Sequence, residues 1–306
     1  MPEQSKTTTH DAEVDARNAD LRIYVNGDIV HRDQAKVSVY DSGFLLGDGV
    51  WEGVRLYNGK WAFLDVHLDR LFEAAKAIDL DFRMDRAGFK AALDATAAAN
   101  RMTANVHARL MVTRGVKAKP FQDPRLSKSG PTMVIIMEHS AASDETFRRG
   151  IRLHTVPFHR GLPLTQDPKL NSHSKLNCIL AGIHAQKAGA DEALMLDPHG
   201  FVNTTNSCNF FIVRRGEVWT STADYCMPGI TRANVIRLCR DNAIPVYEKN
   251  FSLVETYGAE EAFITGTFGA QTPAVEIDGR HISDGPGPVT IRIRELYKAL
   301  VAADTK

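Results

Sequence analysis

Residues 47–59 read GDGVWEGVRLYNG and combine a strand with a tight turn. Residues 51–57 are rich in valine, leucine and aromatic side chains, which favours a strand, and Asn58-Gly59 is a turn dipeptide. Upstream, LRIYVNGDIV at residues 21–30 alternates and then turns at Asn26-Gly27, which predicts a hairpin. A short strand is also expected at residues 37–40. Downstream, apolar residues recur at helical spacing over residues 65–78.

These elements predict a first α+β domain. A second helix is expected at residues 86–100, and strands at 104–113 and 132–137 complete the unit. We expect a flexible tail over residues 1–20, a small domain over 21–140, a polar connection over 141–150 and a large domain over 151–306. In the large domain we expect a strand at 151–157 and a helix at 175–188 that ends at Gly189. Its further strands are expected near 192–196, 209–213, 217–220, 244–249 and 262–265, with helices at 231–242 and 288–302.

Composition limits the possible functions. Of the 306 residues, 43% are hydrophobic, enough for two domains with buried cores. Basic and acidic residues number 37 each, so no net charge attracts nucleic acid or an anionic membrane. No apolar run of about eighteen residues predicts a membrane span, and residues 1–20 lack the apolar stretch of a secretory signal. No Gly-x-Gly-x-x-Gly follows the first strand, which argues against a Rossmann dehydrogenase.

The cysteines give no sign of a metal site. They lack the Cys-x-x-Cys spacing, and no histidine stands beside them at ligand spacing. We therefore expect four reduced thiols in a cytoplasmic protein, and no metal.

Three segments could bind phosphate. Gly229-Ile230-Thr231-Arg232 opens a predicted helix, where backbone N–H groups and a threonine hydroxyl face an anion. Thr265-Gly266-Thr267 ends an apolar strand with two hydroxyls, and Arg70 lies on the helix predicted at 65–78. Arginine binds phosphate through two parallel hydrogen bonds. Taken singly, each segment is better explained as a capped helix, a turn or a surface arginine.

Two lysines flank the segment KLNSHSK, at Lys169 and Lys175. A lysine that forms a Schiff base must be partly desolvated to be nucleophilic at neutral pH. Most lysines are simply exposed, so neither position is convincing alone.

The order of the motifs is more specific than any one of them. GDGVWEGVRLYNG is followed by HLDRL, K…LNCILA, AGADEALMLDPHGFV, NFFIV, GITR and EEAFITGT. This order resembles the fold-type IV pyridoxal-phosphate (PLP) enzymes, a family that includes branched-chain and D-amino-acid aminotransferases. The resemblance covers residues 22–282. It implies a two-domain α+β fold with a smaller N-terminal and a larger C-terminal, PLP-binding domain.

The resemblance assigns roles residue by residue. A Schiff base with PLP is implied for Lys169, or for Lys175 because the spacing differs from relatives by one or two residues. The implied cofactor-binding residues are Arg70, Thr204, Ile230, Thr231 and Thr267. The implied substrate-binding residues are Tyr40, Trp51, Arg55, His107, Arg109 and Phe268. Arg109 could meet a substrate carboxylate, or could be a structural arginine of its strand.

Thr204 departs from the family pattern. Relatives place a glutamate there, against the pyridine nitrogen of PLP. A carboxylate keeps that nitrogen protonated and the ring a strong electron sink, which a hydroxyl does less well. Thr204 therefore keeps a second reaction open, a PLP-dependent lyase that performs β-elimination or acts like aminodeoxychorismate lyase. A descendant that has lost catalysis is a third reading.

The function expected from the resemblance is PLP-dependent transfer of an amino group from an amino acid or amine to a 2-keto acid. Such an enzyme would be a homodimer in amino acid metabolism, with small-molecule substrates and neither nucleic acid nor membrane as partner. The sequence leaves the donor and its stereochemistry open. The arginine-histidine pair of D-amino-acid enzymes is missing after Thr113-Arg114-Gly115, although Lys117 or Lys119 could bind a carboxylate instead.

Overall fold

The computed structural model describes residues 15–306, which form two compact units. The first unit contains residues 15–141, Leu170–Lys175 and Ala302–Lys306. The second unit contains Ala142–Lys169 and Leu176–Val301. Residues 170–175 and 302–306, which were expected in the large domain, thus join the first unit. Residues 170–175 join the first unit because Ser172 forms a β-bridge with Val50 of that unit.

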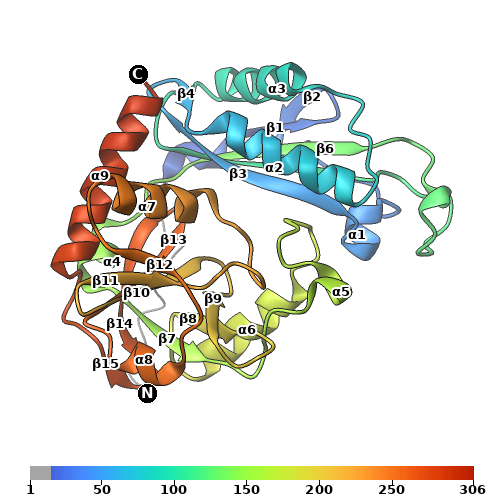
Figure 1. The fold of residues 1–306 in the computed structure, drawn as a ribbon. Coiled ribbons are helices and arrows are strands. Elements are labelled where there is room, and N and C mark those ends of the chain that lie inside the picture. The colour runs from blue at the N-terminus through green and yellow to red at the C-terminus, as the bar shows by residue number, and fades with distance from the viewer. Residues whose placement is uncertain (1–14) are drawn as a thin grey trace. The chain divides into compact units, whose positions relative to one another are not determined.

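The first unit is built on an antiparallel six-stranded sheet (Figure 1). Its strands, in the spatial order β2-β1-β6-β5-β3-β4, are β1 (Arg22–Val25), β2 (Asp28–His31), β3 (Gly49–Tyr57), β4 (Lys60–Trp61), β5 (Val106–Thr113) and β6 (Thr132–His139). The expected hairpin at 21–30 is confirmed, with Asn26 and Gly27 at φ 52° and 106°. Two positive φ angles in a two-residue loop match the twist of the strands.

Two helices cover one face of this sheet, α2 (Leu64–Ala77) and α3 (Arg86–Ala99). The core beneath them includes Phe72, Phe82 and Phe89, whose ring centroids lie 5.1–5.6 Å apart in edge-to-face pairs. Such pairs are favourable because the positive edge of one ring meets the negative face of another. The remaining helical segments of the unit are η1 (Ala16–Ala19), η2 (Arg32–Gln34), α1 (Ser42–Leu46) and η3 (Pro124–Leu126).

Several expectations for this unit need correction. Residues 37–40 form no strand, because Val37, Val39 and Tyr40 all lie exposed in a loop. Residues 1–14 of the expected tail lie outside the described residues. Residues 16–19 are helical, and the side chain of Asn18 makes hydrogen bonds of 2.8 Å to both backbone groups of His139.

The second unit contains a sheet whose strands close into a ring. The spatial order is β12-β11-β10-β13-β14-β7-β8-β9, and β9 pairs back with β10. The strands are β7 (Ile151–Thr155), β8 (Glu192–Leu196), β9 (Val202–Thr205), β10 (Asn209–Arg214), β11 (Glu217–Thr220), β12 (Val246–Glu248), β13 (Glu261–Gly266), β14 (Ala270–Ile277) and β15 (Arg280–His281). The helices are α4 (Asp144–Arg149), α5 (Pro163–Gln166), α6 (Leu176–Lys187), α7 (Ile230–Asp241), α8 (Leu253–Tyr257) and α9 (Pro288–Asp304), the last of which ends in residues of the first unit. Strands β9, β14 and β15 and helices α4, α5 and α8 were not expected, and α4 lies within the supposed connection.

Alternate residues of β10 serve two different cores. Phe210 and Ile212 pack with the residues of one cluster, whereas Phe211 and Val213 pack with side chains of α7 and α9. Phe211 stacks on Phe263 of β13 with ring centroids 5.0 Å apart. A strand buried on both faces has no polar alternation, which is why NFFIV is almost wholly apolar.

Within residues 15–306, no helix is long and apolar enough to cross a membrane. The four cysteines are free thiols.

Candidate active site

Strands β3 and β5 place four of the expected substrate-binding residues on one face of the first unit's sheet. Gly53 pairs with Arg109 and Arg55 pairs with His107. Because side chains alternate along a strand and paired residues point the same way, these residues and Trp51 share one face. The guanidinium carbon of Arg109 lies 3.8 Å from the centre of the Trp51 ring. The fifth expected residue, Tyr40, is 46% exposed in the loop before α1.

The segment that follows Lys169 lies along β3. Asn171 exchanges two hydrogen bonds with the backbone of Trp51, at 3.0 and 2.6 Å, and the His173 backbone N–H donates to Gly49 O at 2.9 Å. The indole N–H of Trp51 donates to Ser172 O at 3.1 Å. These bonds fix residues 171–173 along β3. Two residues further on, Nζ of Lys175 lies 5.8 Å from the centre of the same indole ring.

This face carries Arg109, with Lys175 beside the same indole ring, and also Glu138 of β6, which pairs with His107. No carboxylate among residues 15–306 lies within ion-pair distance of Arg109, and burial lowers the pKa of its guanidinium. Burial, with the nearby charges of Arg109 and Lys175, lowers the pKa of His173 to about 4, so its ring is neutral at pH 7. Two cations beside one indole ring favour an anionic ligand group.

The opposite face of β3 carries a buried ion pair. Glu52 is 1% exposed and accepts hydrogen bonds from Arg70 Nε at 2.7 Å and Arg70 Nη2 at 2.8 Å. His67 Nδ1 lies 2.7 Å from the same carboxylate. Burial alone would raise the pKa of Glu52, but hydrogen bonds from His67 and Arg70 outweigh it and lower that pKa. Arg70 is therefore held by a carboxylate that stays ionised.

In the second unit, Asn209 joins the segments expected to bind the cofactor. It pairs with Thr204 of β9 on one side and with Thr265 of β13 on the other. Its side-chain amide donates to Met227 O at 2.9 Å, just before α7. A Cβ atom at Gly229 would collide with this side chain, so only glycine lets α7 begin so close to β10. These contacts bring β9, the end of β13 and the start of α7 together.

The N-terminus of α7 suits an anion. Gly229, the N-cap residue, offers no side-chain hydrogen bond, and the first turn contains no acidic residue. By contrast, Glu261 caps α9 by accepting from the N–H groups of Val289 and Thr290 at 3.0 and 2.8 Å. Ile230 and Thr231 are buried in the first turn of α7. A helix start with N–H groups, a hydroxyl and no carboxylate fits a phosphate.

The other expected residues of this unit lie on its loops and strand ends. Thr267 and Phe268 follow β13 and are half-buried. Thr204 is 3% exposed, and its hydroxyl donates to Cys208 O at 2.6 Å. Lys169 is exposed in a turn after α5, where its backbone N–H donates to Asp167 at 2.9 Å. Lys175 is the more buried of the two lysines.

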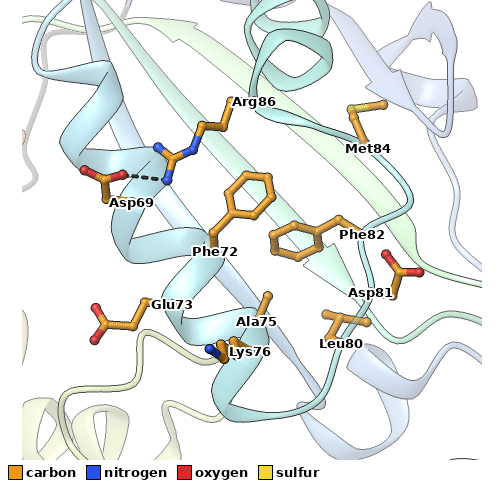
Figure 2. A pocket seen from close by; sticks show the side chains of 10 residues that line it. All are labelled: Asp69, Phe72, Glu73, Ala75, Lys76, Leu80, Asp81, Phe82, Met84 and Arg86. Carbon is orange, nitrogen blue, oxygen red and sulfur yellow. Dashed lines mark ion pairs between the residues drawn. The ribbon is translucent and has the colours of Figure 1, made fainter.

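A pocket of about 500 Å³ lies between α2 and residues 80–86 (Figure 2). Asp69, Phe72 and Arg86 are among its lining residues, and Arg86 bonds Asp69 at 2.6 Å. None of the expected site residues lines it.

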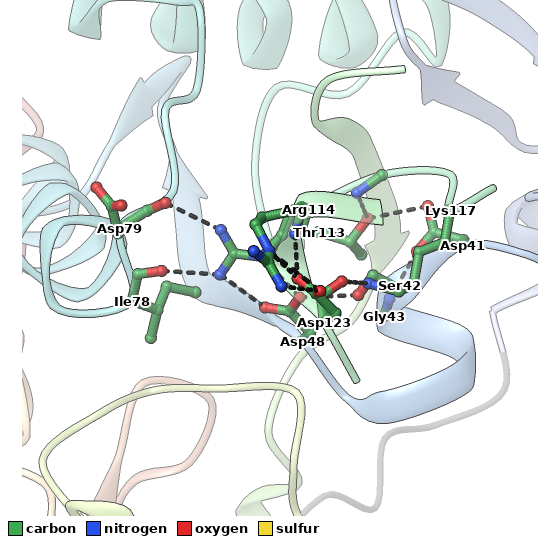
Figure 3. A network of polar contacts seen from close by, with 12 residues as sticks. Asp41, Ser42, Gly43, Asp48, Ile78, Asp79, Thr113, Arg114, Lys117 and Asp123 are labelled. Atoms are coloured by element: carbon green, nitrogen blue, oxygen red, sulfur yellow. Dashed lines mark hydrogen bonds and ion pairs between the residues drawn. The ribbon is translucent and has the colours of Figure 1, made fainter. Parts of the chain in front are cut away.

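The segment after Thr113 is held by a polar network (Figure 3). Arg114 makes hydrogen bonds of 2.7 and 3.1 Å to Asp48, and the hydroxyl of Thr113 donates to Asp41 at 3.0 Å. Lys117 is 3% exposed and donates to the carbonyl of Asp123 at 3.0 Å. Lys117 is therefore part of this loop's own structure.

The fold and these segments match known proteins. The family model described as amino-transferase class IV matches residues 49–277. A branched-chain-amino-acid aminotransferase-like protein 2 from Arabidopsis thaliana is 42% identical over 284 residues, which is 92% of this chain and 51% of that protein. A putative branched-chain-amino-acid aminotransferase from Methanocaldococcus jannaschii is 38% identical over 91% of this chain and 96% of its own length. This chain thus spans about half the length of the plant relative.

The structural comparison agrees. A crystal structure of the T.th. branched-chain amino acid aminotransferase with pyridoxamine 5'-phosphate superposes with a TM-score of 0.86 at 30% identity, covering 93% of this chain and 95% of that one. The chain belongs to the class IV aminotransferase family, and the fold-type IV architecture expected from the sequence is confirmed.

Sequence reasoning missed three residues that organise these segments. The sequence indicated only that Asn209 begins the strand NFFIV, and gave no sign of its contacts. Glu52 lay within GDGVWEGVRLYNG without a role, because its partner is 18 positions away. His173 carried a weak signal, since it sits between the two lysines.

Proposed function

We propose that the protein transfers an amino group from an amino acid or amine to a 2-keto acid with PLP as cofactor. The observation that carries this proposal is the start of α7. It is a buried helix N-terminus with a threonine hydroxyl and no acidic cap, in a chain of the class IV aminotransferase family. The pyridoxamine 5'-phosphate in the T.th. relative supports the same cofactor.

The chain contains the groups that PLP requires. Ile230, Thr231, Thr267 and Arg70 would bind the phosphate. Thr204 would face the cofactor ring. When bound, PLP stabilises the negative charge that develops on the substrate carbon as its proton leaves.

Lys169 is our choice for the residue that holds the cofactor covalently and then moves the proton. Its Nζ would take the proton from the carbon that bears the amino group. The motif order supports Lys169, and its exposed side chain would have to be desolvated when the cofactor binds. Lys175, fixed beside Trp51, is the alternative, and as a cation it would otherwise contribute positive charge to the substrate face.

The substrate would lie against the shared face of β3 and β5. Trp51, Arg55 and His107 would line that side, together with Tyr40 and Phe268 from two loops. Arg109 would bind a carboxylate of the donor or acceptor, because its guanidinium is stacked on Trp51 and has no described acidic partner.

A PLP-dependent lyase is the competing function, and Thr204 is its only support. The single hydroxyl proton of Thr204 is directed at Cys208 O, at 2.6 Å. Towards any other group the oxygen therefore offers lone pairs, which accept a hydrogen bond from a protonated ring nitrogen but not from a neutral one. Thr204 thus favours the protonated ring, and this weakens the argument for the lyase.

We further propose a cytoplasmic homodimer. Helix α6 exposes Leu176, Ile179, Leu180 and Ile183 at 67%, 56%, 37% and 40%. Their spacing places them on one face of the helix, and a solvent-exposed apolar stripe of this length is typical of an interface. A second copy of the chain would bury it.

The dimer is tested by placing a charge in the stripe. Ile179→Glu should convert the species of twice the chain mass to the single-chain mass in light scattering after size exclusion. Val254→Glu, at a residue 78% exposed on α8, is the matched control and should keep the wild-type mass. A single-chain mass for the wild type would refute the proposal.

Amino transfer is tested by its dependence on the acceptor. PLP-loaded protein is incubated with one amino donor at a time, with and without 2-oxoglutarate or pyruvate, and both products are measured. We expect a keto product and an equal amount of new amino acid, formed beyond one turnover only with the acceptor. Repeated turnover without any acceptor would favour the lyase instead.

A further inference from the structure

We propose that Glu52 is a positioning residue, which holds the Arg70 guanidinium for the phosphate of the cofactor. This inference rests on the proposed function, in which Arg70 is one of the phosphate ligands. It adds a role for a carboxylate that none of the motifs had assigned.

Arg70 and Glu52 form a bidentate ion pair within the first unit. Nε of Arg70 donates to one carboxylate oxygen of Glu52 at 2.7 Å, and Nη2 donates to the other at 2.8 Å. Two parallel hydrogen bonds fix the plane of the guanidinium as well as its position. The pairing uses Nε and one hydrogen of Nη2, so the Nη1 edge is directed away from Glu52.

The two side chains of the pair differ in solvent exposure. The side chain of Glu52 is 1% exposed, whereas that of Arg70 is 15% exposed. The carboxylate is thus buried beneath α2, and the Arg70 side chain is the more accessible member of the pair. An arginine restrained in this way loses less conformational freedom when it binds an anion.

His67 restrains the carboxylate in turn. Its Nδ1 lies 2.7 Å from the Glu52 oxygen that also accepts from Nη2 of Arg70. His67 and Arg70 are three residues apart on α2, so they lie on the same face of the helix. With three hydrogen bonds the buried carboxylate is compensated, and it stays ionised opposite Arg70.

If the ion pair only stabilises the fold, its loss should weaken the binding of PLP and pyridoxal alike. If it positions Arg70 for the phosphate, its loss should weaken the binding of PLP alone. The test compares the dissociation constants of PLP and pyridoxal, which differ only in the phosphate, for apo-protein titrated by absorbance. Glu52→Gln keeps the size of the side chain but can accept only one of the two arginine bonds. We expect its PLP affinity to fall about tenfold or more, and its pyridoxal affinity to change less than about twofold.

The matched control is Asp69→Asn. Asp69 is the neighbour of Arg70 in the chain and also pairs with an arginine, Arg86, but its side chain is 64% exposed (Figure 2). This variant should keep both dissociation constants at the wild-type values.

The outcomes separate this inference from the proposed function. If wild-type protein prefers PLP over pyridoxal but Glu52→Gln keeps that ratio, the positioning role is wrong and the function stands. If the wild type itself shows no preference, the proposed phosphate site is wrong. If Glu52→Gln fails to fold, judged by circular dichroism, His67→Gln decides. It should reduce the PLP preference by about threefold, and an unchanged ratio would overturn the inference.

Discussion

Replacing Arg109 by methionine should separate acceptors that carry one carboxylate from those that carry two. Methionine keeps an unbranched side chain against Trp51 but removes the charge. A hydrogen bond to a charged group contributes about 1.5–3 kcal/mol. The guanidinium is half-buried and stacked 3.8 Å from the Trp51 ring centre, so it is preorganised and only partly screened by solvent.

We therefore expect kcat/KM for 2-oxoglutarate to fall about 10- to 150-fold in Arg109→Met. The value for pyruvate should fall less than about threefold, because pyruvate has no second carboxylate to lose a partner. Both are measured as initial rates of amino acid formation with one fixed amino donor. Arg86→Met, which removes a cation 5.2 Å from the Phe72 ring at the surface, is the control and should change neither rate.

An equal loss for both acceptors would show that Arg109 meets the carboxylate they share, or acts only through the fold. No loss for either would remove Arg109 from the substrate site. Thermal unfolding of the variant separates the two explanations of an equal loss, because only an effect through the fold lowers the unfolding temperature.

Three further predictions concern stability. With the pKa of His173 at about 4 in the folded protein, the unfolded chain takes up a proton near pH 6.5 that the native state cannot bind. The free energy of unfolding should therefore fall, by at most about 3 kcal/mol, as the pH drops from about 6.5 to about 4, and His173→Gln should remove this slope in urea titrations. Phe263→Ala deletes a fully buried ring stacked on Phe211 and should cost about 3–5 kcal/mol by the same assay; a loss below about 1 kcal/mol would contradict the packing. Thr204→Val removes one donor from the carbonyl of Cys208, which keeps other donors, so we expect a loss of only about 1 kcal/mol, and a loss above about 3 kcal/mol would contradict this.

Local patterns were sufficient for the elements with strong periodicity. Helices α2 and α7 bury one face each, and β10 is apolar from Phe210 to Val213, so the pattern of side chains predicts how these elements pack. The hairpin of β1 and β2 follows from Asn26-Gly27, because few other residues adopt two positive φ angles in succession.

The missed strands break these patterns for physical reasons. In β9, Val202–Thr205, three of four buried side chains are polar, and the hydroxyls of Thr204 and Thr205 are satisfied by the carbonyl of Cys208. In β14, Pro273 lies in a central strand, where a missing N–H argues against pairing, and an irregularity between Ala274 and Glu276 shifts the register there.

The opposite error occurred at residues 37–40. The alternation of valine and serine predicted a strand. Such a pattern shows that one face of the segment could be buried, but not that it is buried. Here Val39 is 66% exposed and no described strand pairs with the segment.

The same limit applies to the site. Residue types and motif order were enough to propose the phosphate-binding positions and to select four residues that β3 and β5 place on one face, whose roles stay predictions. The bidentate ion pair between Glu52 and Arg70 depends on how α2 lies on β3, and the role of Asn209 depends on the pairing of three strands. Neither is visible in the local sequence.

Borohydride reduction of the PLP-loaded protein, followed by peptide mapping, tests the central claim most directly. We predict that the reduced cofactor is attached to Lys169, and that Lys169→Ala abolishes this attachment while Lys175→Ala retains it. Attachment at Lys175 would exchange the two roles. A yellow, reducible adduct that persists when both lysines are replaced would contradict the whole assignment.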